Sequence, residues 1–335
     1  MISSRVLTSL RDEFGRSLMA KIGVVLILVV VLAAVFAPFL ATQNPREQEL
    51  GQSNLPPVGI TDSSEETQFV DGERQTVTVT EEGSLDHPLG TNQLGQDIYS
   101  RLLYGARTSL LVGLFGTAIA ALTGVSVGLV AGYYGGRVDD TLMRFADIML
   151  AFPALVLAIA LIGLLGPRAV NIPDPFVAAG LVSGMPDVVT LPLTVTLVIA
   201  LVNWVWFARV ARGEALSVRE KNYVKASRSL GASDRRLMIR HVLPNSLTPI
   251  IVLATVQIAV IIVLESALSF LGFSGTTLSW GFDINQGRDL LATSWWISTM
   301  PGMAIVLTVI GINLIGDWMR DALDPDIEGE SGGGA

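Results

Sequence analysis

The chain has 335 residues, of which 50% are hydrophobic and only 16% are charged, and its net charge is -8. A soluble domain carries roughly 25% charged residues. This composition, with a mean hydropathy of +0.55, excludes an ordinary soluble protein and indicates a membrane protein.

Six runs without charge are long enough to cross a bilayer as helices, since about 20 apolar residues suffice for one crossing. The first is 22–41, and the others lie between Arg107 and Arg137, Asp147 and Arg168, Asp187 and Arg209, Arg240 and Glu265, and Asp289 and Asp317. Barrel strands need only about 10 residues. The sequence therefore predicts an all-α integral membrane protein with six transmembrane helices.

Residues 1–41 are predicted to form a cytoplasmic N-terminus and an uncleaved first helix. The apolar run is longer than the core of a signal peptide, about 7 to 15 residues, and Pro38 and Phe39 stand where cleavage needs small residues. With the N-terminus inside, most of the 22 lysines and arginines fall on the cytoplasmic side. Both termini are therefore predicted to be cytoplasmic, the C-terminal tail being 321–335.

Residues 42–104 are predicted to form an external loop and a segment that precedes the second helix. In 75–80, Val77 and Val79 alternate with threonines, which favours a short strand or hairpin arm. The loop is interpreted as solvated, or alternatively as a docking surface for an external partner. An amphipathic helix is expected at 97–104, and His87 is interpreted as structural.

Residues 105–320 are assigned to a five-helix core. Within it, 135–147 is predicted to be a solvated cytoplasmic turn and 167–192 an irregular external loop. Gly124 and Gly128 are four residues apart, a spacing that lets helices approach closely. They predict tight helix packing.

Three polar residues of the core are candidates for the pathway or its gate. Glu265 is an acid at the end of a long apolar run, and such acids are costly in a membrane. It is expected to pair structurally, to gate the external mouth, or to contact substrate. Asn203 and Gln257 could line a pathway, although hydrogen bonds between helices are favoured for each.

The segment 209–245, named the basic loop below, concentrates positive charge. It could be a topological signal, a surface on anionic lipid or a surface for a partner protein, and its length favours the partner. Its nine bases are Arg209, Arg212, Arg219, Lys221, Lys225, Arg228, Arg235, Arg236 and Arg240, against the acids Glu214, Glu220 and Asp234.

The basic loop is predicted to contain two short helices separated by Gly231, which can take the positive φ that ends a helix. Ser233 is expected to be the N-cap of the second helix, with Asp234 in its first turn. Pro244 and Asn245 are expected to end that helix.

Residues 223–245 resemble the EAA loop of permease subunits in bacterial and archaeal ABC importers. Lys225, Ala226 and Ser227 stand at the EAA positions, so that two of the three letters differ. The glycine and the Leu-Pro pair keep their spacing. Residues 87–113 (HPLGTNQLGQDIYSRLLYGARTSLLVG), 265–272 (ESALSFLG) and 317–325 (DWMRDALDP) are similar to dipeptide, oligopeptide and nickel permeases of the second-subunit type.

The resemblance implies a type I ABC importer permease fold and a non-catalytic subunit of the cytoplasmic membrane. Its partners would be a second permease subunit in a heterodimer, two ATPase subunits, an external substrate-binding protein and membrane lipid, but no nucleic acid. The imported solute would be a peptide, or alternatively nickel or another small solute. The residues expected to couple to an ATPase are Tyr223, Val224, Lys225, Ala226, Ser227, Leu230, Gly231, Leu243 and Pro244.

No cofactor, metal or catalytic residue is expected in the chain itself. It has no phosphate-binding GxxxxGK[ST] sequence, so ATP and Mg²⁺ are assigned to the partner ATPases. A secondary transporter remains an alternative, but it should carry coupling-ion acids or broken helices near the midplane. An intramembrane hydrolase is disfavoured, because cysteine is absent and His87 and His241 lie outside the apolar runs.

Overall fold

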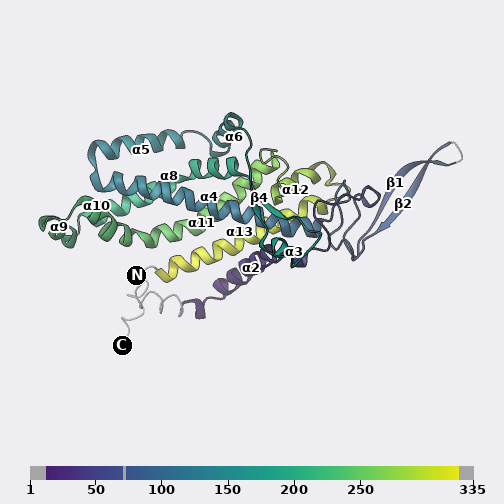
Figure 1. Ribbon diagram of the computed structural model, residues 1–335, viewed down its shortest axis with the longest axis horizontal. Coiled ribbons are helices and arrows are strands. Elements are labelled where there is room, and N and C mark those ends of the chain that lie inside the picture. Colours follow the sequence, from purple (N-terminus) through teal and green to yellow (C-terminus); the bar gives the residue numbers. More distant parts are fainter. Residues whose placement is uncertain (1–12, 71–72, 324–335) are drawn as a thin grey trace.

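A computed structural model describes residues 13–70 and 73–323. The molecule is elongated, and different elements occupy its two ends (Figure 1). The loop end carries α9 (Asn222–Ser229) and α10 (Asp234–Leu237), and the hairpin end carries β1 (Thr61–Val70) and β2 (Glu73–Glu82). The predicted tail, 321–335, lies almost wholly outside the described residues.

Among the described residues, five helices are long and apolar enough to cross a membrane, and one bent pair could add a sixth crossing. This confirms the predicted helical membrane class. The five are α2 (Leu18–Val35), α4 (Ile98–Tyr134), α8 (Leu193–Arg219), the helix that runs through α10 into α11 (Leu243–Phe270), and α13 (Trp296–Leu323).

The hairpin end contains most of the short elements. β1 and β2 pair as antiparallel strands from Thr61 opposite Glu82 to Val70 opposite Glu73, which confirms the predicted hairpin arm. β3 and β4 also pair antiparallel, so the segment predicted to be irregular contains local β structure. The remaining elements are α3 (Ala37–Leu40), η1 (Leu50–Gln52), β3 (Val170–Pro173), α7 (Pro175–Ala178), β4 (Val188–Leu191), α12 (Trp280–Gly287) and η3 (Arg288–Leu290).

The third crossing differs from its prediction. The segment 135–147, predicted to be a solvated turn, mostly forms α5 (Gly136–Leu150). Gly135, at φ 67°, makes the turn by itself, so that the helix begins at the next residue. The third crossing was predicted as one run between Asp147 and Arg168, whereas α5 and α6 (Ala154–Leu165) form a bent pair that meets at 91°. Pro153 lacks an amide hydrogen and disfavours helical backbone before it, which breaks the helix there.

Both boundaries of the basic loop also differ from prediction. α8 continues past Arg209 to Arg219. Pro244 and Asn245 do not end the second helix, because α10 passes through the π-helix η2 (Met238–Val242) directly into α11. Proline is tolerated in the first turn of a helix, and the π turn changes the hydrogen-bond register just before it.

The core is organised around α4. Its N-cap is Asp97, whose side chain accepts a hydrogen bond from the amide of Ser100 at 2.7 Å, so the amphipathic helix expected at 97–104 is simply the start of α4. α8, α11 and α2 all pack against α4, and α13 packs between α2 and α11. α2 begins and α13 ends toward the loop end (Figure 1).

A row of glycines forms the seam between α4 and α8. A Cβ atom at Gly124 or Gly128 would collide with the carbonyl oxygen of Trp204 or Ala208, and one at Gly132 with backbone of Arg212. The two helices therefore approach at backbone distance, which confirms the packing predicted from Gly124 and Gly128.

Candidate coupling site and the polar residues of the bundle

α9 is a largely exposed helix of the basic loop and carries most of the predicted coupling residues. Val224 is 1% exposed and anchors α9 on the bundle, while Leu230 is 89% exposed. Tyr223, Lys225 and Ala226 are also exposed. The helix therefore presents a mixed polar and apolar face to its surroundings. Ser227 donates from Oγ to the carbonyl of Tyr223 at 2.9 Å.

The turn between the two short helices agrees with the prediction. Gly231 has φ 85°, and a Cβ atom there would have no neighbour within 4 Å. Ser233 is the N-cap residue of α10, although its side chain makes no capping hydrogen bond, and Asp234 lies in the first turn. Leu243 and Pro244 lie in the first turn of α11, separated from α10 by the π turn.

The surface of the basic loop is positively charged. Arg235, Arg236 and Arg240 line a hollow of about 480 Å³. Lys225 lies 2.9 Å from Glu220, and its hydrogen bond and charge lower the pKa of that exposed carboxyl group. Glu220 therefore stays ionised at neutral pH and offsets one base, while the three arginines of the hollow remain exposed.

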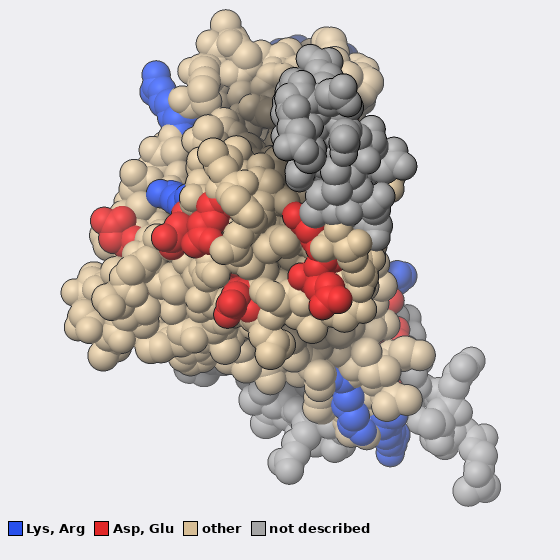
Figure 2. Space-filling view, turned by 90° about the vertical axis from the view of Figure 1, so that its right-hand side faces the viewer, with Lys and Arg blue, Asp and Glu red and all other residues tan. Residues whose placement is uncertain are grey.

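The surface of the hairpin end has the opposite sign. Figure 2, which looks onto this end, shows acidic side chains gathered in several patches with few bases between them. The exposed acids that come from elements of this end are Glu47, Glu82, Asp86, Asp187 and Asp289.

Charges inside the hairpin end are buried and paired. Arg101 and Asp283 form an ion pair whose side chains are 4% and 3% exposed, and Arg107 pairs with Asp174. Burial raises the pKa of Asp174, but hydrogen bonds from Arg107 and from the amides of Phe176 and Val177 outweigh it, so the pKa lies below its ordinary value.

His87 is also buried at this end, with Nδ1 at 3.3 Å from Asp97 Oδ1 and Nε2 at 2.7 Å from Gln52 Oε1. Asp97 in turn accepts from Thr42 at 2.8 Å and caps α4. The cluster ties the long loop to the start of α4, in agreement with the structural interpretation of His87.

Glu265 is fully buried among serines. Ser109 of α4 donates to Oε2 at 3.0 Å, and Ser269 donates to Oε1 at 2.6 Å. The carboxyl group therefore links α11 to α4. A role in gating or substrate contact stays a prediction.

The other two pathway candidates are buried as well. The amide nitrogen of Asn203 donates to the carbonyl of Ile199 in its own helix at 2.9 Å, so the favoured hydrogen bond between helices is wrong for this group. A polar residue can satisfy itself on the carbonyl four residues earlier without any partner helix. Gln257 is 5% exposed, and its role in a pathway stays a prediction.

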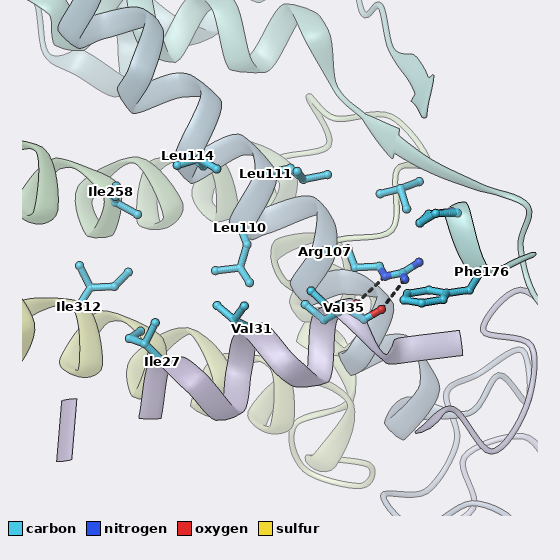
Figure 3. Close-up of a pocket in the computed structure, with 13 residues that line it drawn as sticks. Ile27, Val31, Val35, Arg107, Leu110, Leu111, Leu114, Phe176, Ile258 and Ile312 are labelled. Carbon is cyan, nitrogen blue, oxygen red and sulfur yellow. Dashed lines mark hydrogen bonds between the residues drawn. The ribbon is translucent and has the colours of Figure 1, made fainter. Parts of the chain in front are cut away.

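An apolar pocket of about 510 Å³ lies between α2 and α4, with Ile258 of α11 and Ile312 of α13 at one end and Phe176 at the other (Figure 3). Of the described residues that line it, Arg107 alone is charged. All three guanidinium nitrogens already donate hydrogen bonds, to the carbonyls of Ala34 and Val35 and to Asp174. The pocket therefore offers no free charge to a polar solute.

The residues that anchor the basic loop were not among the predicted functional residues. Arg212 donates to both carboxylate oxygens of Asp139 in α5 at 2.5 and 2.6 Å. Arg219 donates to the carbonyl of Gly132 in α4 at 2.9 Å. The hydroxyl of Tyr133 also contacts the loop. The available signal was the cluster of tyrosines, glycines and acids that directly follows the apolar part of 98–134.

Comparison with known proteins gives the family. Residues 124–329 match the family described as binding-protein-dependent transport system inner membrane component, and residues 10–57 match the N-terminal TM domain of oligopeptide transport permease C. A putative peptide transport system permease protein of Brucella suis biovar 1 is 37% identical over 328 residues, covering 97% of this chain and 93% of the relative.

Two further proteins are similar. The di/tripeptide transport system permease protein DppC of Pseudomonas aeruginosa is 35% identical over 319 residues, covering 95% of this chain and 91% of the relative. A chain of the MetNI methionine ABC transporter, solved in inward-facing conformations, has a TM-score of 0.51 at 15% identity, covering 67% of this chain and 97% of that one. The similarity to the MetNI chain concerns the fold alone. This chain belongs to the family of binding-protein-dependent transport system inner membrane components and is a permease subunit of an ABC transporter.

Proposed function

We propose that this permease subunit forms half of the translocation pathway of an ATP-driven importer of di- and oligopeptides. The relatives named for peptide and di/tripeptide transport match more than nine tenths of the chain, which supports this substrate class. A second permease of similar fold would complete the pathway as a heterodimer, and an external binding protein would deliver the peptide.

The observation that carries the coupling role is the form of α9. Tyr223 of α9 and Leu230 just after its end are exposed around the buried anchor Val224, and the exposed bases beside them can complement acidic groups of a partner. We assign this surface to docking of an ATPase subunit. ATP and Mg²⁺ would be held by the two ATPases, so the chain alone should bind no cofactor or metal and hydrolyse no ATP.

The proposed orientation places the loop end in the cytoplasm. The basic loop lies there, and α2 begins and α13 ends toward the same end (Figure 1). The N-terminus and the tail 321–335 would then be cytoplasmic. The segment 42–104, with the acidic surface around it (Figure 2), would face outward and meet the binding protein.

The test compares two glycines with the same backbone strain. Gly231 and Gly180 have φ 85° and 71°, and neither has an atom within 4 Å of an added Cβ. In a complete transporter reconstituted in liposomes, Gly231→Val should lower uptake of labelled dialanine about tenfold, within the range usual for coupled sites. Gly180→Val, at the hairpin end, should leave uptake unchanged. Equal losses in both variants would refute a coupling role for the loop, and a wild-type assembly that imports no dialanine would refute the substrate class.

A further inference from the structure

Tyr133 joins three elements at the loop end. It is the penultimate residue of α4, and its side chain is 3% exposed in a core cluster that also contains Val224 and Leu237. Its hydroxyl donates to Asp234 Oδ1 at 2.6 Å, and Arg228 Nη2 donates to the same hydroxyl at 2.8 Å. One phenol group from α4 therefore holds the last turn of α9 and the first turn of α10.

The ring of Tyr133 adds a second contact to the same arginine. The guanidinium carbon of Arg228 lies 5.2 Å from the ring centroid, within the range of a cation–π interaction. The hydrogen bonds of the hydroxyl with Asp234 and Arg228 fix the direction of the Tyr133 side chain, while burial of the ring fixes its position. The junction therefore resists both rotation and translation of the two short helices against α4.

Of the two covalent connections from α9 and α10 into the membrane, through α8 and through α11, the one through α11 is the less regular. α10 enters α11 through five residues of π-helix, with Pro244 in the first turn of α11 and Pro249 inside the following turns. π turns and prolines are the common sites at which helices bend. A displacement of α9 and α10 can therefore be absorbed partly by bending at the start of α11.

The connection through α4 has no such interruption. α4 is one helix from Ile98 to Tyr134, 37 residues, or about 55 Å at about 1.5 Å per residue. Near its other end, Arg101 pairs with Asp283 of α12, Arg107 with Asp174, and Ser109 bonds Glu265. One rigid element therefore links the basic loop to the elements of the hairpin end.

We propose that Tyr133 is a positioning residue whose hydroxyl fixes α9 and α10 to the end of α4, so that displacement of the basic loop moves α4 and reaches the hairpin end. This inference rests on the proposed docking of an ATPase at the loop. It assigns the transmission of the displacement mainly to α4, which contacts the basic loop through side chains. The helix that follows the loop in the sequence, α11, would transmit less of it.

The experiment uses the absence of cysteine to place a single label. Leu181, which is 64% exposed shortly after α7, is changed to cysteine, and the purified subunit is labelled with an environment-sensitive fluorophore before it is assembled into the complete transporter. The signal is the fluorescence change when a non-hydrolysable ATP analogue is added. Tyr133→Phe keeps the buried ring and removes only the hydroxyl, and it should reduce this change at least about fivefold, the lower range of coupling between sites, while the ATPases still co-purify.

Tyr134→Phe is the matched control. Tyr134 is adjacent and 51% exposed, and the loss of its hydroxyl should leave the fluorescence change at its wild-type size. Asp234→Ala, a change at an exposed position, should reproduce the effect of Tyr133→Phe, and the double variant should lose no more than either single one. A wild-type response in Tyr133→Phe or in Asp234→Ala would overturn the inference. A wild-type transporter whose ATPases co-purify but which shows no response to the analogue would also overturn it, whereas ATPases that do not co-purify with the wild-type subunit would refute the proposed docking.

Discussion

The two ends of the molecule handle charge in opposite ways. Inside the hairpin end two arginines, Arg101 and Arg107, are buried and paired, and the side chains of the Arg101–Asp283 pair are 4% and 3% exposed. At the loop end a comparable pair, Arg209 with Asp147, is 47% and 63% exposed. Buried pairs fix geometry because neither charge can find another partner, whereas exposed charges remain available to a second protein. The comparison indicates a rigid hairpin end and a loop end suited to exchange of partners.

The largest expected effect comes from breaking a buried pair. Arg101→Met leaves Asp283 buried without its cation, which should lower the free energy of unfolding by about 3–5 kcal/mol. Arg209→Met should cost at most about 1 kcal/mol, since exposed pairs contribute little. Thermal unfolding of the purified protein in detergent measures both. The double variant Arg101→Met with Asp283→Leu should recover much of the loss, and similar losses in the two single variants would break the comparison.

The second prediction concerns the pH dependence of the other buried pair. The pKa of Asp174 is lowered in the folded state, so its contribution to stability is present above the unfolded pKa of about 3.9 and is lost as the pH falls through the lower folded value. Asp174→Asn should therefore be much less stable than wild type at pH 7, and the difference in melting temperature should shrink below about pH 4.

Asp187 supplies the control for that experiment, because it is an exposed acid of the same loop. Asp187→Asn should change the melting temperature little at pH 7. A difference between wild type and Asp174→Asn that stayed constant down to pH 3 would show that the ion pair with Arg107 does not stabilise the hairpin end through charge.

The smallest effect is expected in the seam that joins the two ends. Gly128→Ala places a methyl group against the backbone of Ala208, and such overpacking costs about 1–3 kcal/mol. Gly213→Ala in α8 meets no atom within 4 Å and should be neutral or stabilising by up to about 1 kcal/mol. Unfolding in denaturant separates the two variants, and equal stability would mean that α4 and α8 can separate without cost.

Much of the helical bundle could be predicted from local patterns. Runs without charge identified the crossings, the alternation of Val77 and Val79 identified a strand, and the spacing of Gly124 and Gly128 identified a close helix contact. These patterns predict structure correctly because each one lies within a short stretch of sequence. Gly231 was also recognised, since a glycine with positive φ has no easy substitute.

The errors came from interactions that local patterns do not contain. Pro244 was expected to end a helix, but the preceding π turn accommodates it. The charged residues of 135–147 suggested solvent, whereas Asp139 is held by Arg212 from another helix. Tyr133 showed no sign of its partners, because Arg228 and Asp234 lie about 100 residues later. Side chains that meet only after helices pack cannot be identified from periodicity.

The buried pair of Arg101 and Asp283 has a consequence for biosynthesis. Its members are 182 residues apart, and at about 5–20 residues per second roughly 10–40 seconds separate their emergence from the ribosome. During that interval the arginine at the start of α4 has no carboxylate, and its long side chain must keep its charged head in water. The Arg101–Asp283 pair can form only after α12 has been translated, so the closing of this part of the hairpin end is a late step in the assembly of the subunit.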